Sequence, residues 1–130
     1  MRRSTLSLAA ALALAGCDHF RDTPPARQVG DADPERGAKA LVAYGCSGCH
    51  FVPGIREATS WVAPPLHNYG ERAYVAGVVS NNAENLVAWI RDPQAVNPRT
   101  AMPNLGVTEQ DARNIAAYLY SLHQGRQGPL

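Results

Sequence analysis

The feature that most constrains this chain is the run Cys46-Ser47-Gly48-Cys49-His50. Two thiols three positions apart on one turn can each add to a vinyl group of a haem, and the histidine that follows can then bind the iron. A structural zinc site usually needs four protein ligands, and a thioredoxin-like pair stands in a βαβ unit; this sequence indicates neither. A structural disulfide is sterically tight at this spacing and leaves His50 without a role. The motif therefore predicts one covalently bound haem c.

The sixth iron ligand decides whether such a site binds ligands or only transfers electrons. The sequence has two methionines, and Met1 belongs to a predicted signal, so Met102 is the single thioether of the expected mature chain. It lies in a loop between Pro98 and Pro103, which would present its side chain rigidly. A core methionine is the alternative, and His67 and His123 are rival ligands. We expect His50 and Met102 to bind the iron.

The first residues have the layout of a bacterial export signal. Met1-Arg2-Arg3 is basic, the run from Thr5 to Ala15 is apolar, and the segment ends in Leu14-Ala15-Gly16-Cys17. This ending resembles the lipobox, in which the cysteine is acylated and becomes the new amino terminus. We expect residues 1–16 to be removed and Cys17 to anchor the chain, because two or more acyl chains hold a protein stably on a membrane. The alternative is an ordinary signal peptide with a cysteine near its end by chance.

The rest of the chain is expected to form one small all-α domain over residues 33–123, between a flexible tether (17–32) and a short tail (124–130). Apolar residues at helical spacing, with capping residues and breakers, predict three main helices. They run from Asp33 to about Tyr44 before Gly45, from Asn81 or Asn82 (Asn81 and Glu84 imitate a capping box) to Pro93, and from Thr108 to about His123. A short helix near 71–76 is also expected. No alternating strand pattern is present.

With these residues placed, residues 33–123 resemble the class I, mitochondrial-type cytochrome c domain. The order of the parts carries the resemblance: a helix into the haem motif, Pro64-Pro65-Leu66, an amphipathic helix, Met102, and a last helix with Ala117-Tyr118-Leu119. In particular, the chain resembles the haem domain fused to subunit II of some bacterial haem–copper oxidases, through Trp89-Ile90 and Ala101-Met102-Pro103. The resemblance implies a cytochrome c fold, with helices and loops wrapped around the haem.

The resemblance also implies roles for further residues. The carbonyl of Pro64 would accept a hydrogen bond from Nδ1 of the proximal histidine, Arg72 would approach a haem propionate, and Thr100 would hydrogen-bond a propionate or its water. Trp89, with Leu86 and Ile90, would form the methionine side of the haem pocket. The first and last helices would pair through Gly37 or Ala38 against Tyr118 and Leu119.

Iron with both axial positions filled has no site for a small-molecule substrate, so we expect an electron carrier and not an enzyme. With 12 basic and 11 acidic residues, the chain lacks the basic excess of a nucleic-acid binder. The expected location is the periplasmic side of the bacterial inner membrane, which Asp18 beside the lipidated cysteine favours, with respiratory complexes as redox partners. Two alternatives remain: an electron-transfer subunit of a periplasmic dehydrogenase or oxidase, and a haem-based gas sensor.

Overall fold

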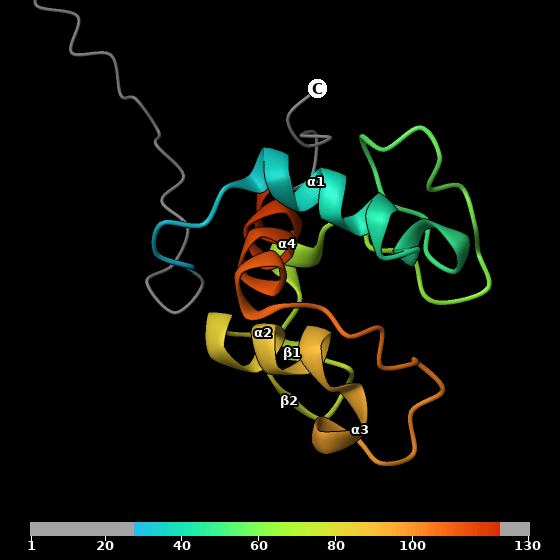
Figure 1. Ribbon diagram of the computed structural model, residues 1–130. Helices are drawn as coiled ribbons and strands as arrows, with labels where there is room; N and C mark the ends of the chain where they lie inside the picture. Colours follow the sequence, from blue (N-terminus) through green and yellow to red (C-terminus); the bar gives the residue numbers. More distant parts are fainter. Residues whose placement is uncertain (1–27, 123–130) are drawn as a thin grey trace, which may run out of the picture.

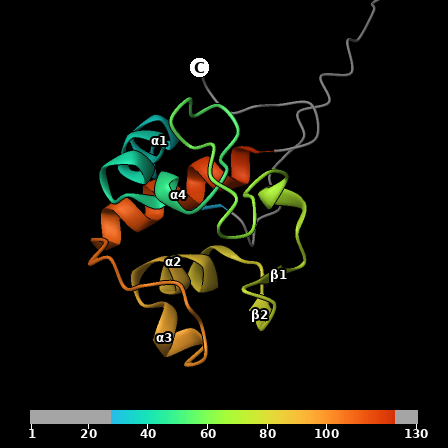
Figure 2. The same ribbon diagram turned by 90° about the vertical axis from the view of Figure 1, so that its right-hand side faces the viewer.

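The computed structural model describes residues 28–122, and these form a mostly helical domain (Figure 1). Two short 3₁₀ turns and a two-stranded hairpin connect four helices. In chain order the elements are α1 (Pro34–Ala43), η2 (Cys46–Gly48), η3 (Tyr69–Glu71), β1 (Tyr74–Val75), β2 (Val79–Ser80), α2 (Ala83–Arg91), α3 (Pro93–Val96) and α4 (Glu109–Ser121). Helix α4 lies between α1 and α2 and packs against both, as both views show (Figures 1 and 2). The predicted all-α class and its three main helices are confirmed.

The helix boundaries follow from capping residues in the sequence. Oδ1 of Asp33 accepts hydrogen bonds from the backbone N–H groups of Glu35 and Arg36 at the start of α1, and Gly45, with φ of 76°, follows its end. Thr108 caps α4 by accepting from Asp111 N at 3.2 Å. For α2 the cap is Asn82, whose side chain accepts from Asn85 N at 2.9 Å, so of the two predicted starts Asn82 is confirmed, and the suggested capping box of Asn81 and Glu84 does not mark the start.

The crossing of α1 and α4 depends on a residue without a side chain. A Cβ atom at Gly37 would lie 2.0 Å from the backbone oxygen of Asn114 and 3.0 Å from the nitrogen of Ile115. Across the same crossing, Asp33 N donates to Oδ1 of Asn114 at 2.9 Å. Gly37, and not Ala38, therefore makes the close approach. It contacts α4 at Asn114 and Ile115, which lie N-terminal to the predicted partners Tyr118 and Leu119.

The core lies between the three longer helices and the loops that follow η2. It includes Leu41 of α1, Leu86 of α2, and Ile115 and Tyr118 of α4, all 2% exposed or less. Val29 is also buried, at 8% exposure, and packs in the same cluster, so packing begins upstream of the residue-33 boundary predicted for the tether. Among the described residues, none of the helices has the length and apolar character that crossing a membrane requires.

The segment 69–80 differs from the sequence-based expectation. In place of a short helix near 71–76, the chain makes η3 and then a hairpin in which Tyr74 pairs with Ser80 and Val75 with Val79. Ala76 and Gly77 have φ of 51° and 72°, which ends any helix there and turns the chain back. The β-branched Val75 and Val79 favour the extended backbone on either side of that turn. The pairs are too few to produce a readable alternation of apolar and polar residues.

The predicted signal (1–16), the lipidation site Cys17, most of the tether, His123 and the tail 124–130 lie outside the described residues.

Candidate haem-binding site

The motif Cys46–His50 forms a tight turn directly after α1. Gly45 takes a left-handed conformation, η2 follows, and the backbone N–H of His50 donates to the carbonyl of Cys46 at 2.9 Å. Both cysteines are free thiols, with Cys46 half-buried and Cys49 exposed. Burial raises the pKa of the Cys46 thiol. The turn thus offers two unpaired thiols, with no disulfide between them, next to an imidazole.

The ring of His50 is held by a hydrogen bond to the Pro64 carbonyl. Nδ1 lies 2.7 Å from that oxygen, and because a carbonyl only accepts, Nδ1 carries the proton. The acceptor loop is itself fixed against the motif, since Ala63 N donates to Cys49 O at 2.9 Å and Leu66 N donates to Phe51 O at 2.8 Å. The hydrogen bond expected between His50 and Pro64 is therefore present. It leaves the lone pair of Nε2 for a metal and orients the ring.

Arg72 connects this loop to the next turn of chain. Its guanidinium donates to the carbonyls of Pro65 and His67, the latter at 3.1 Å, and lies 4.9 Å from the centre of the Tyr69 ring. The side chain therefore holds the residues that follow Pro64. Its contact with a haem propionate stays a prediction. The rival ligand His67 has an exposed side chain on the same loop.

Asn81 also supports the turn that carries Arg72, a role that the sequence did not indicate. Its side-chain amide is buried, at 6% exposure for the residue, and donates to the carbonyls of Tyr69 and Arg72 at 3.1 and 2.9 Å. Its oxygen accepts from the Tyr120 hydroxyl of α4 at 3.0 Å. The turn that carries Arg72 is thus fastened to the last helix. A polar residue in the sequence gives no sign of such distant partners, so only the fold could reveal them.

Met102 lies half-buried in the loop between α3 and α4, and both polar groups of its backbone are hydrogen-bonded to side chains. The N–H donates to Oγ1 of Thr100 at 3.1 Å, and the carbonyl accepts from Nε2 of Gln94 at 2.7 Å. Thr100 was predicted at the site through a different contact, to a propionate, which stays a prediction. Gln94 was not predicted, because an exposed glutamine beside a proline carries no sequence signal.

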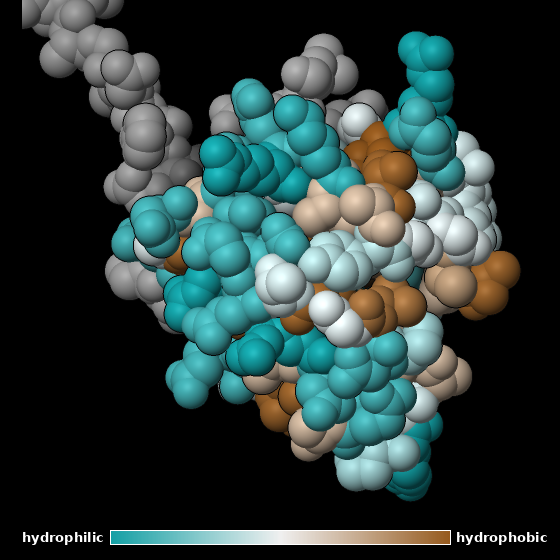
Figure 3. Space-filling model, in the orientation of Figure 1, coloured by the Kyte–Doolittle hydropathy of each residue, from teal (hydrophilic) through white to brown (hydrophobic). Residues whose placement is uncertain are grey.

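The two predicted iron ligands come from separate parts of the fold. In Figure 1 both segments lie to the right of α4, with the Cys46–His50 turn above and the Met102 loop below. Trp89 of α2 is half-buried and packs against the core, and Leu86 and Ile90 of the same helix are buried. The space-filling view shows apolar surface at the right-hand edge, over the loop after η2 (Figure 3).

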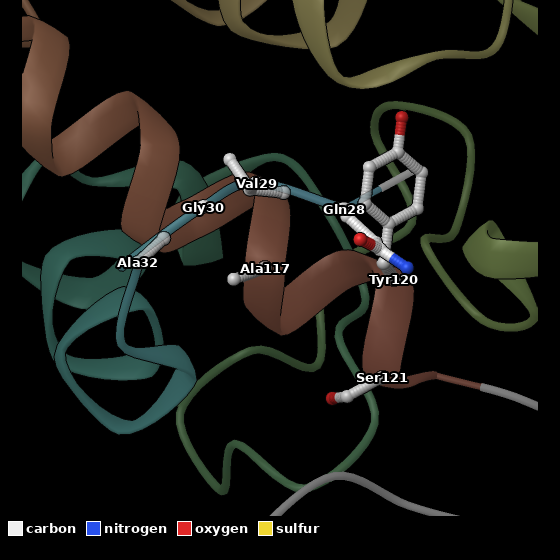
Figure 4. Close-up of a pocket in the computed structure, with 7 residues that line it drawn as sticks. All are labelled: Gln28, Val29, Gly30, Ala32, Ala117, Tyr120 and Ser121. Atoms are coloured by element: carbon white, nitrogen blue, oxygen red, sulfur yellow. The ribbon is translucent and has the colours of Figure 1, made fainter. Parts of the chain in front are cut away.

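A separate pocket lies between the segment 28–32 and the second half of α4 (Figure 4). Val29, Ala117 and Tyr120 are among its lining residues, and none of the residues predicted to hold a haem takes part. This pocket is distinct from the candidate site.

The chemistry of the donor set fits a c-type haem. The described residues supply two free thiols for covalent attachment, an imidazole whose Nδ1–H is engaged in a hydrogen bond, and one thioether, in Met102. A zinc site would instead need several such ligands together, and within residues 28–122 no group of three or more His, Cys, Asp or Glu side chains is placed to hold a metal.

Comparison with known proteins supports the same cofactor. The sequence model of the cytochrome c family matches residues 34–123. Cytochrome c oxidase subunit 2 of Alkalihalophilus pseudofirmus is 41% identical over 88 residues, which cover 67% of this chain and 25% of that protein. The same subunit of Bacillus sp. strain PS3 is 36% identical over 88 residues, covering 65% and 25%. The chain thus spans about a quarter of the length of these relatives.

Among solved structures, the chain is similar to cytochrome c2 from Rhodobacter sphaeroides. The TM-score is 0.49 at 21% sequence identity, with 77% of this chain and all of that chain covered.

Proposed function

Because this chain belongs to the cytochrome c family, and so carries covalent haem c and transfers electrons, we propose that it is a membrane-tethered periplasmic carrier with His50 and Met102 as iron ligands. Cys46 and Cys49 would hold the haem through thioether bonds. When bound, the haem supplies an iron that exchanges one electron at a time. With both axial positions filled, the site has no room for a substrate, so the chain acts as a carrier and not as an enzyme.

The observation that carries this proposal is the hydrogen bond from His50 Nδ1 to the Pro64 carbonyl. It fixes the tautomer that leaves Nε2 for the iron, and it strengthens the imidazole as a donor. The backbone of the second proposed ligand, Met102, is held by hydrogen bonds at both its N–H and its carbonyl. Ligands held this firmly change position little between the two oxidation states. A small rearrangement favours rapid electron transfer.

The proposed tether and location follow from the sequence before the domain. The run Leu14-Ala15-Gly16-Cys17 supports lipidation at Cys17, with the domain on the periplasmic side of the inner membrane. Sharing a membrane with its partners raises the effective concentration of a carrier. This suits a protein with a single lysine, Lys39, and a formal net charge of only +1, which gives little net charge for long-range steering. Metabolic labelling with a fatty acid, lost in Cys17→Ala, tests the anchor.

The redox partners are proposed to be respiratory complexes, with a terminal oxidase as the first candidate. The similarity to oxidase subunits from two bacteria supports this choice. The surface beside the haem motif also suits protein contact, since Trp61 and Val62 are 68% and 82% exposed and the next residue, Ala63, bonds to Cys49. The same similarity favours a second candidate, a permanent subunit of an oxidase or dehydrogenase complex. Co-purification from detergent-solubilised membranes distinguishes a subunit from a free carrier.

The ligation is tested by absorption spectroscopy of the purified protein. The ferric wild type should show the weak red absorption band of iron bound to a thioether, and the ferrous form should not bind carbon monoxide. Met102→Ala should lose the band and bind carbon monoxide, whereas His67→Ala should behave as the wild type. Persistence of the band in Met102→Ala would refute the assignment. Carbon monoxide binding by the wild type would instead support a gas sensor.

A further inference from the structure

The carbonyl of Met102 belongs to an unusual peptide group. The next residue is Pro103, so the peptide that joins them has no N–H. The carbonyl is therefore the only group through which a hydrogen bond can fix this peptide. In the structure that hydrogen bond comes from Nε2 of Gln94, at 2.7 Å.

Gln94 is well placed to hold the loop because its own position is fixed. It is the second residue of α3, directly after Pro93, which is buried. The start of the helix is capped by Asp92, whose Oδ1 accepts from Ala95 N at 3.2 Å, and the end is closed by Asn97 N donating to Pro93 O at 2.8 Å. A short but capped helix thus supports the donor.

The loop between Gln94 and Met102 is anchored on its other side as well. Asn97 accepts from Thr100 N at its carbonyl and from Arg99 N at Oδ1, at 3.0 and 3.1 Å. Thr100 Oγ1 then accepts from Met102 N at 3.1 Å. Thr100 thus holds the backbone N–H of Met102, and Gln94 holds its carbonyl. Without Gln94, the peptide between Met102 and Pro103 would lose the hydrogen bond that holds its carbonyl.

We infer that Gln94 is a positioning residue for Met102: it sets how firmly the thioether keeps its place against competing iron ligands. The inference rests on the proposed ligation by Met102. Gln94 acts only through the Met102 backbone, so it influences ligand retention and not the presence of the haem. Its loss should leave a coloured, folded protein whose sixth position is more easily taken by an added ligand.

The test is titration of the ferric haem protein with imidazole. Gln94→Glu keeps the size of the side chain but replaces the donor with a carboxylate, which cannot donate to a carbonyl. Gln94→Ala removes the donor without adding charge. Both variants should bind imidazole about tenfold more tightly than the wild type, which corresponds to ~1.4 kcal/mol. Gln94→Lys, which keeps a donor, should bind imidazole less tightly than the other two variants. Arg99→Ala, an exposed change in the same loop, should match the wild type.

The outcomes separate this inference from the proposed function. If Met102→Ala abolishes the thioether band but Gln94→Glu and Gln94→Ala bind imidazole like the wild type, the inference alone is wrong. The inference also fails if only Gln94→Glu has an effect, because charge and not the lost hydrogen bond would then be responsible. If Met102→Ala keeps the band, the proposed ligation itself fails. Circular dichroism of each variant checks that the overall helical content is unchanged.

Discussion

Replacing Gly37 with alanine tests the packing on which the fold depends. The added Cβ would lie 2.0 Å from the Asn114 oxygen and 2.5 Å from the Asn114 carbonyl carbon. Both are backbone atoms of α4, so no side chain can rotate away. To restore an ordinary contact of about 3.4 Å, the two helices must separate by roughly 1.4 Å at the crossing. The hydrogen bond from Asp33 N to the Asn114 side chain crosses the same contact and would lengthen.

The magnitude follows from two opposed effects. Overpacking a well-packed interface costs about 1–3 kcal/mol, and a clash with rigid backbone belongs at the upper end or above it. Alanine in a helix interior gains ~1 kcal/mol over glycine. The net destabilisation should therefore be at least about 2 kcal/mol, or a fall in melting temperature of roughly 8 °C or more for a domain of this size.

The assay is guanidinium unfolding of the haem-loaded protein, followed by far-ultraviolet circular dichroism. Lys39→Gly is the matched control, because Lys39 is exposed in the same helix and the change there reports helix propensity alone, at a cost of ~1 kcal/mol. If Gly37→Ala is neutral or stabilises the protein, helix propensity dominates at this position and the close crossing does not limit packing.

Two further changes test buried tyrosines by equilibrium unfolding. Tyr118→Phe removes the hydroxyl that donates to Pro53 O at 2.6 Å and should cost about 1–3 kcal/mol, whereas exposed Tyr74→Phe should cost little; equal costs would contradict a role for this bond. Burial raises the pKa of Tyr69 to about 12, although Arg72 acts in the opposite direction. The Tyr69 hydroxyl therefore stays protonated to a higher pH in the folded state than in the unfolded state. The contribution of Tyr69 to stability is complete below pH ~10 and lost as pH rises towards 12. Between pH 9 and 11.5, Tyr69→Phe should therefore lose less stability than the wild type; identical losses would show that Tyr69 does not titrate as a buried group.

The sequence predicted those parts of the site whose chemistry depends on neighbours in the chain. Cys46, Cys49 and His50 are close together in the sequence, so their spacing alone indicates how they act. The helix caps Asp33 and Thr108 are equally local, since a cap bonds to residues two or three positions away. The bond from His50 to Pro64 joins residues 14 positions apart, and it was anticipated only through the family resemblance.

Contacts between distant residues were missed where a side chain had a plausible local role. Asn81 resembled a helix cap, but the fold buries it between η3 and α4, where it bonds to two carbonyls. Gln94 was not singled out in the sequence, since its bond to Met102 depends on how α3 and the loop face each other. The hairpin at Tyr74 to Ser80 was missed for a different reason, because two residues per strand are too few to establish a period.

The crossing at Gly37 and Asn114 also determines how well the domain tolerates inserted residues. It joins regions such as Asp33 and Asn114 that lie 81 residues apart, so folding must close a long loop. The entropic cost of closing a flexible loop rises only with the logarithm of the loop length, so doubling the length adds about 0.6 kcal/mol. Exposed segments such as the one around Trp61 and Val62 can therefore accept inserted residues at a small cost in stability, provided that the two helices still meet at their glycine.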